Sequence, residues 1–146
     1  MTSYLWLLLL IPWLPLTFLL HNALHESSHA IVARAAGAEI TGFWLFPNNH
    51  LGRFTFAYVT YRGKIEGKMY LLLLVAPLII ETLWIIIMGS LLIIAFSFAW
   101  PLLVKLLLIG EILSALTDMT TWWIGWFRKS PNTDGFLTRT YLQNAK

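Results

Sequence analysis

The chain has 146 residues, a formal net charge of +3, no cysteine and a mean hydropathy of +0.71. Hydrophobic residues make up 58% of it and charged residues only 12%, which excludes an ordinary soluble domain and is typical of a protein embedded in a lipid bilayer. Without cysteine there is no disulfide framework and no thiolate metal site, and because the basic residues flank the apolar segments we expect no nucleic-acid partner.

The first expected element is a transmembrane helix over residues 12–37, with residues 4–11 as an apolar lead-in. About 20 apolar residues are needed to cross a bilayer, and Pro12 or Pro15 is tolerated at the start of a helix. Gly37 predicts the end of this helix. No basic residue precedes the apolar run, so the pattern does not indicate a cleaved signal peptide.

A metal-binding motif lies in the second half of this segment, where residues 25–29 read His-Glu-Ser-Ser-His. On a helix, residues four positions apart share one face, so His25 and His29 can bind the same Zn²⁺. Glu26 lies beside them and is the candidate general base that takes a proton from water. Ionisable residues at membrane depth are costly and are usually functional, which favours a catalytic zinc site over a chance match.

Residues 40–62 differ from the segments on either side because they are rich in β-branched and aromatic residues. Two such runs, 42–46 and 53–61, are separated by the turn-forming residues 47–52, which predicts a β-hairpin. An irregular interfacial loop is the alternative. If the hairpin forms, its exposed edge can bind another extended chain through backbone hydrogen bonds.

Two more transmembrane helices are expected over residues 69–99 and 102–127, with a tight turn at Trp100-Pro101 between them. Residues 128–146 are expected to form a polar tail. The predicted fold is a single α-helical membrane domain, residues 1–146, with three transmembrane helices and a small cytoplasmic β-hairpin between the first and the second.

The distribution of basic residues predicts the orientation of this multi-pass protein. Lys and Arg concentrate between the first two expected spans and after the third, whereas only Lys105 falls on the opposite side. The positive-inside rule then makes the hairpin and the C-terminus cytoplasmic and leaves the N-terminus outside.

A catalytic zinc ion needs a third protein ligand, and the other acidic residues within the expected spans are Glu81, at a depth of ~20 Å, Glu111 and Asp118. At 1.5 Å of rise per residue, His29 and His25 lie ~12 and ~18 Å from the expected cytoplasmic end of their helix. By the same measure Asp118 lies at a depth of ~15 Å and Glu111 at ~25 Å. The depth argument therefore favours Asp118 over Glu111.

His21, Glu81 and Glu111 lie within the expected spans and have more than one possible role. His21 is one helical turn before His25, where it can support the metal site, relay protons or simply bond to a neighbouring helix. We expect Glu81 and Glu111 to pair with His21 or with each other, since an unpaired carboxylate is costly at that depth. Contact with a partner subunit is the alternative for these two residues.

The stretch from His25 to Gly37, which continues Ala-Ile-Val-Ala-Arg-Ala-Ala-Gly after the motif, resembles the motif helix of site-2-protease-type intramembrane zinc metalloproteases. The order of elements over residues 15–127 is also similar. The resemblance implies His25 and His29 as zinc ligands, Glu26 as general base and Asp118 as third ligand. This sequence departs from the family's pattern in two places. Around Asp118 the family's usual Asn-x-x-Pro and Leu-Asp-Gly signatures are not found, and the sequence at Ala76-Pro77 also differs from the family's usual one.

The predicted function is a zinc-dependent intramembrane endopeptidase that cleaves a transmembrane segment of a membrane-protein substrate near its cytoplasmic side. The alternative is a small non-catalytic subunit that keeps the metalloprotease-like fold and binds other membrane subunits. A zinc ion with an open, water-bearing position supports the peptidase, whereas a closed site or no metal supports the subunit.

Overall fold

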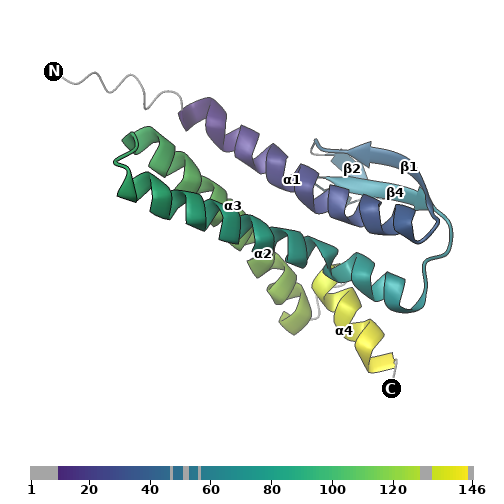
Figure 1. The fold of residues 1–146 in the computed structure, drawn as a ribbon. Coiled ribbons are helices and arrows are strands. Elements are labelled where there is room, and N and C mark those ends of the chain that lie inside the picture. The colour runs from purple at the N-terminus through teal and green to yellow at the C-terminus, as the bar shows by residue number, and fades with distance from the viewer. Residues whose placement is uncertain (1–9, 47, 51–52, 56, 129–132, 145–146) are drawn as a thin grey trace.

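The structure is a computed structural model that describes residues 10–46, 48–50, 53–55, 57–128 and 133–144. Three long helices dominate it, α1 (Leu10–Ala35), α2 (Gly67–Ser97) and α3 (Leu102–Arg128). A short fourth helix, α4 (Asp134–Asn144), follows them. Figure 1 shows the long helices packed along one another, with the strands beside the C-terminal half of α1 and α4 close to the C-terminal end of α3.

Gly37 ends α1 through a defined backbone motif. Its φ of 85° lies in the left-handed region, which glycine adopts without a steric penalty. The amide of Gly37 bonds to the carbonyl of Arg34 at 3.0 Å, and the amide of Ala38 bonds to the carbonyl of Ala33 at 3.0 Å. This pair of bonds is the Schellman motif, so the predicted stop at Gly37 is confirmed.

The expectation of three transmembrane helices is wrong. Among the described residues, only α2 is both long enough and apolar enough to cross a membrane, with a mean hydropathy of 2.6 over its most apolar window. The other two predicted spans, 12–37 and 102–127, are helical and long, but His, Asn, Ser, Thr and acidic residues interrupt their apolar sequence. Length and helical form alone do not make a helix stable in hydrocarbon. The predicted lead-in at residues 4–9 lies outside the described residues.

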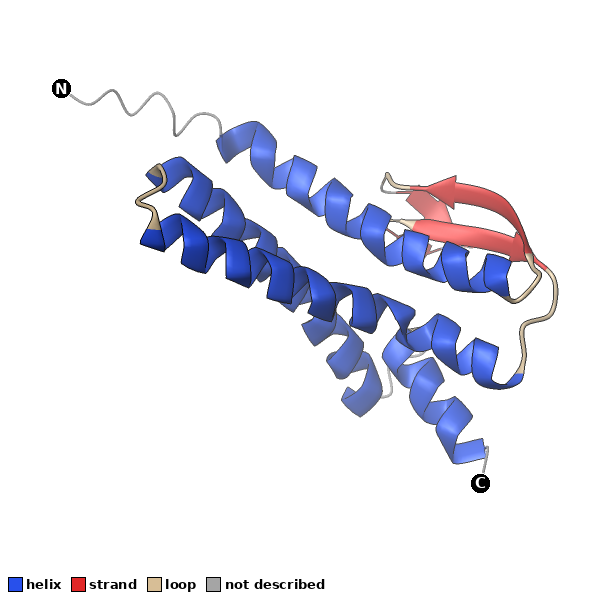
Figure 2. Cartoon of the chain, viewed as in Figure 1, coloured by secondary structure: helices blue, strands red, loops and turns tan. Residues whose placement is uncertain are grey.

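The strands form two small antiparallel pairs within the region predicted to be a hairpin. Strand β1 (Glu39–Trp44) pairs with β4 (Tyr58–Arg62), and its register shifts between Ile40 and Gly42. The shorter β2 (Asn48–His50) and β3 (Arg53–Thr55) pair with each other further out. Figure 2 shows the strands on one side of α1. Three of the six residues of the predicted turn, 47 and 51–52, lie outside the described residues, and the other three form β2.

A small apolar core attaches this sheet to the helices. It contains residues from the end of α1, from the turn after it and from the start of α2, namely Val32, Ala33, Ala38, Leu73 and Ala76. Ile40 and Tyr61, one from each strand of the pair, pack against this core. The sheet is therefore fixed next to the half of α1 that carries the His-Glu-His residues.

Two glycines bring α4 into close contact with α3, which the prediction of a polar tail over 128–146 did not include. A Cβ added at Gly135 would collide with the carbonyl oxygen of Trp122 and would lie 2.8 Å from the amide nitrogen of Trp126. A Cβ added at Gly125 would collide with the Thr133 side chain. The backbones of the two helices can approach this closely only because both positions lack a side chain.

Candidate metal centre

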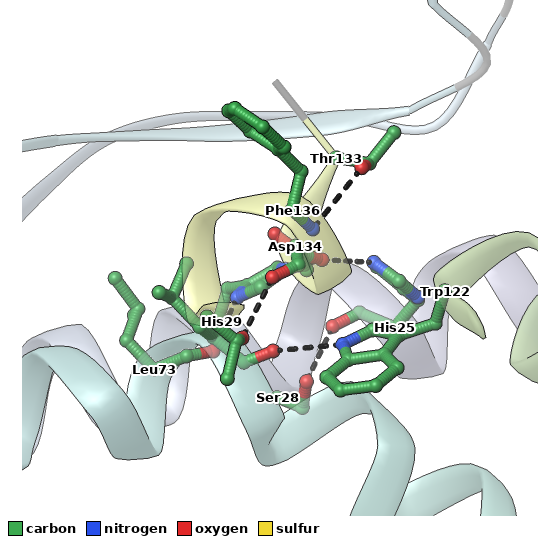
Figure 3. A network of polar contacts seen from close by, with 10 residues as sticks. His25, Ser28, His29, Leu73, Trp122, Thr133, Asp134 and Phe136 are labelled. Atoms are coloured by element: carbon green, nitrogen blue, oxygen red, sulfur yellow. Dashed lines mark hydrogen bonds and ion pairs between the residues drawn. The ribbon is translucent and has the colours of Figure 1, made fainter. Parts of the chain in front are cut away.

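His25 and His29 lie one turn apart on α1 and point the same way, as their spacing predicts. Their ring centroids are 5.1 Å apart. Both reach Asp134 at the start of α4, because its Oδ2 lies 3.3 Å from His25 Nε2 and 3.2 Å from His29 Nε2. Figure 3 shows the two imidazoles converging on this one carboxylate.

A proline in α2 fixes the orientation of the His29 ring. Pro77 has no amide hydrogen, so the carbonyl of Leu73, four residues earlier, receives no helical bond from it. His29 Nδ1 lies 2.9 Å from this carbonyl oxygen. A carbonyl can only accept, so Nδ1 carries the proton and donates it. In the neutral ring, Nε2 then presents a lone pair, which is the tautomer that metal-binding histidines need.

The distances among these groups fit a bound cation. The carboxylate of Asp134 only accepts hydrogen bonds, and neutral His29 Nε2 is also an acceptor, so their contact at 3.2 Å needs a positive charge between or on them. The three ligand atoms of His25, His29 and Asp134 all lie within 4.8 Å of one another. Tetrahedral ligands ~2.1 Å from zinc are separated by ~3.4 Å. The two histidine–carboxylate distances, 3.3 and 3.2 Å, match that separation.

The N-terminus of α4 holds Asp134 as a charged carboxylate. Thr133 caps the helix, since its hydroxyl oxygen accepts a bond from the amide of Phe136 at 3.4 Å. The positive end of the helix dipole favours a negative charge at this position. Burial alone raises the pKa of the Asp134 carboxyl, but the hydrogen bonds and charges of His25 and His29 outweigh burial and hold this pKa far below its usual range. Asp134 is therefore ready to bind a metal without first losing a proton.

A cavity of about 460 Å³ opens beside the three ligands. Glu26 lines it together with His25, His29 and Asp134, and its side chain is largely buried. Strand β4 forms another wall of the cavity through Tyr58, Val59 and Tyr61. The candidate ligands, the candidate base and one strand therefore surround a single space.

The structure places Asp118 elsewhere than beside the histidine pair. Asp118 lines the same cavity, but its carboxylate groups with His21 and Glu81. The depth argument compared only the residues of the long helices, whereas after Arg128 the chain returns to α3 and brings Asp134 to the histidines. The structure thus offers Asp134, rather than Asp118 or Glu111, as the third ligand.

One sequence signal for this residue was present. Asp134-Gly135 contains the Asp-Gly step of the Leu-Asp-Gly signature that is absent around Asp118. Thr133 before it is a favourable N-cap residue for the helix that follows. The predicted pairing with His21 is confirmed for Glu111, whose Oε2 lies 3.3 Å from His21 Nε2. Glu81 Oε2 lies 3.6 Å from His21 Nδ1, beyond hydrogen-bond distance.

Comparisons with protein-family models, with curated proteins and with solved structures find no match to this chain. The function must therefore be argued from the site itself.

Proposed function

We propose that this protein is a membrane-bound, zinc-dependent endopeptidase. It cleaves a transmembrane segment of a membrane-protein substrate, near the cytoplasmic end of that segment. The observation that carries the proposal is the convergence of His25, His29 and Asp134 within 4.8 Å beside a cavity that Glu26 also lines. Three protein ligands next to an accessible space are typical of catalytic zinc sites, which keep one position open for water.

Each side chain has a separate task in this proposal. Zinc, when bound, lowers the pKa of its water molecule and polarises the scissile carbonyl group. His25, His29 and Asp134 hold the ion, and the Leu73 carbonyl keeps His29 in the right tautomer. Glu26 accepts the proton of the attacking water and returns it to the leaving amine.

The free edge of β4 is the proposed binding site for the substrate backbone. A transmembrane helix satisfies its own amide groups, so a segment must unwind before one of its peptide bonds can be attacked. Strand β4 pairs with β1 along one edge, and among the described strands none pairs with its other edge. An unwound substrate can add to that edge by backbone hydrogen bonding, which places it above Glu26 and the histidines.

Helix α2 is the proposed membrane anchor. It exposes large apolar side chains along its length, such as Ile86 at 58% and Ile93 at 69% exposure, and a lipid bilayer would cover them. Lys64 and Lys68 near its start predict that this end is cytoplasmic. Because the chain has no cysteine, single cysteines at positions 64 and 100 can test this orientation. We expect labelling of position 64 only from the cytoplasm and of position 100 only from outside, and the reverse pattern would contradict it.

The substitution Glu26→Gln tests the catalytic role. The amide keeps the size of the side chain but cannot accept a proton, so kcat should fall about 10²–10⁴-fold. Zinc content should be unchanged, because Glu26 is not a ligand in this proposal. The assay is cleavage of a reconstituted single-span membrane protein by the purified chain, with zinc measured by mass spectrometry.

Glu66→Gln is the matched control, since Glu66 is an exposed glutamate that pairs with Lys64 on the surface. It should cleave like the parent chain. Equal cleavage by the Glu26 and Glu66 variants would contradict the assignment of the base. A zinc-loaded parent that cleaves no membrane protein would instead support the non-catalytic subunit.

A further inference from the structure

Behind the metal centre, His21, Glu81, Glu111 and Asp118 form a second polar cluster that the proposed peptidase does not use. The four residues come from three helices: His21 from α1, Glu81 from α2, and the other two from α3. His21 and Glu81 are each only 1% exposed. Within the described residues, no ion pair joins these carboxylates to Lys or Arg.

The hydrogen bonding of His21 fixes which of its nitrogens is free. His21 Nε2 lies 3.1 Å from the carbonyl oxygen of Glu111 and 3.3 Å from its Oε2, and Trp84 Nε1 donates to the same carboxylate oxygen at 3.3 Å. Both neighbours of Nε2 are acceptors, so Nε2 carries the proton. Nδ1 of the neutral ring then presents a lone pair, 3.6 Å from Oε2 of Glu81 and without a hydrogen-bond partner.

The carboxylate of Glu81 is a second, independent observation that points to cation binding. Both of its oxygens are fully buried and have no hydrogen-bond partner. Burial of an unpartnered carboxylate is costly. A proton on Glu81 would find no acceptor within hydrogen-bond distance, since His21 Nδ1 lies 3.6 Å from Oε2 and neither oxygen has another partner. A cation resolves the arrangement, since it binds several acceptors at once.

We propose that His21, Glu81 and Asp118 bind a second divalent transition-metal ion, separate from the one at His25, His29 and Asp134. Their ligand atoms all lie within 4.8 Å of one another. Ligands on opposite sides of an ion with bonds of ~2.1–2.4 Å are separated by ~4.2–4.8 Å, so one ion can contact all three. One imidazole and two carboxylates suit Zn²⁺, Fe²⁺ or Mn²⁺.

The space beside this cluster fits an ion rather than a substrate. A cavity of about 10 Å³ is lined by Glu81 and Asp118, by His25 of the first metal centre and by largely apolar residues such as Pro77 and Trp122. That is about the volume of one water-sized sphere. Each proposed ligand comes from a different helix, so the ion would join α1, α2 and α3 and neutralise their buried charge. Its effect would be structural.

Zinc stoichiometry of the full-length chain in detergent tests the proposal. After removal of metal with a chelator and dialysis against zinc chloride, we expect two zinc ions per parent chain and one per Glu81→Gln chain. The thermal unfolding midpoint of the parent should rise with zinc, and Glu81→Gln should lose part of that rise. Glu39→Gln, which changes an exposed glutamate, is the control and should bind two.

Equal zinc contents in the parent and Glu81→Gln would overturn this inference, because Glu81 would then hold a proton instead of sharing a metal. Loss of one zinc in Glu81→Gln but none in Asp134→Asn would support the second site and contradict the peptidase site. If Glu81→Gln loses its helicity, cobalt binding to Asp134→Asn decides: one cobalt with a single imidazole ligand supports the proposal, and no bound cobalt overturns it.

Discussion

The two polar clusters use the same residue types but differ in access to solvent. His25, His29 and Asp134 are partly exposed, with 27%, 12% and 22% of their side chains accessible, and they border a cavity of about 460 Å³. His21 and Glu81 are almost completely buried, and Glu81 borders a cavity of about 10 Å³. A substrate and water can reach the first cluster, whereas the cavity beside Glu81 has room for no more than a water-sized group, and only Asp118 of the second cluster also lines the larger cavity. The accessible cluster is therefore suited to catalysis, and the buried cluster is suited to a structural metal ion.

The origin of the carboxylates explains this difference. Glu81 and Asp118 lie within long helices that pack against α1, so their positions are set by the bundle itself. Asp134 comes from a short helix that reaches the histidines only because Gly125 and Gly135 let it approach α3 closely. The first cluster therefore depends on the docking of α4, and it should be the easier one to disrupt without unfolding the protein.

Gly135→Ala should disturb the first cluster most. The added methyl group collides with the carbonyl oxygen of Trp122, so α4 must shift and carry Asp134 away from the histidines. Overpacking of this kind costs about 1–3 kcal/mol, and zinc sites tolerate ligand shifts of only about 0.2 Å. If that cost weakens metal binding, it corresponds to about 5–150-fold in zinc affinity, and we expect a value near 100-fold, measured by competition with a chromophoric chelator.

Gly89→Ala is the matched control, because a Cβ at Gly89 in α2 has no atom within 4 Å. It should bind zinc like the parent chain. If the two variants bind zinc equally, the close contact between α3 and α4 does not position Asp134.

Pro77→Ala should have a smaller effect on the same cluster. Alanine restores an amide that can bond to the Leu73 carbonyl, so it competes with His29 Nδ1 for that acceptor. Loss of such a supporting bond weakens metal binding about 10–100-fold, and we expect a value near the lower limit because the imidazole itself stays in place.

Pro15→Ala, which replaces the proline inside α1, is the control for general effects of a proline in a helix. It should leave zinc affinity at the parent level. An unchanged affinity in Pro77→Ala would show that the Leu73 carbonyl does not fix the His29 tautomer.

The sequence predicts the features of this molecule that depend on local patterns. The helical stretches follow from apolar runs and from Gly37, and the pairing of His25 with His29 follows from helical spacing. The position of Asp134 depends on a chain reversal after Arg128 and on two glycine contacts between helices, which no local periodicity encodes. The prediction of three membrane spans from hydropathy and length is wrong for residues 12–37 and 102–127, because polar and ionisable residues interrupt their apolar sequence.

The most direct test of the metal centre is the zinc dissociation constant of Asp134→Asn compared with Asp118→Asn, both made in the Glu81→Gln chain to remove the second cluster. Because loss of a supporting group already weakens binding about 10–100-fold, loss of a direct ligand should weaken it more than about 100-fold. We therefore predict that Asp134→Asn loses at least that much affinity, whereas Asp118→Asn stays within a few-fold of its parent. Tight zinc binding by Asp134→Asn together with weak zinc binding by Asp118→Asn would contradict the assignment of Asp134 as the third ligand. It would show instead that Asp118 of α3 binds the zinc ion.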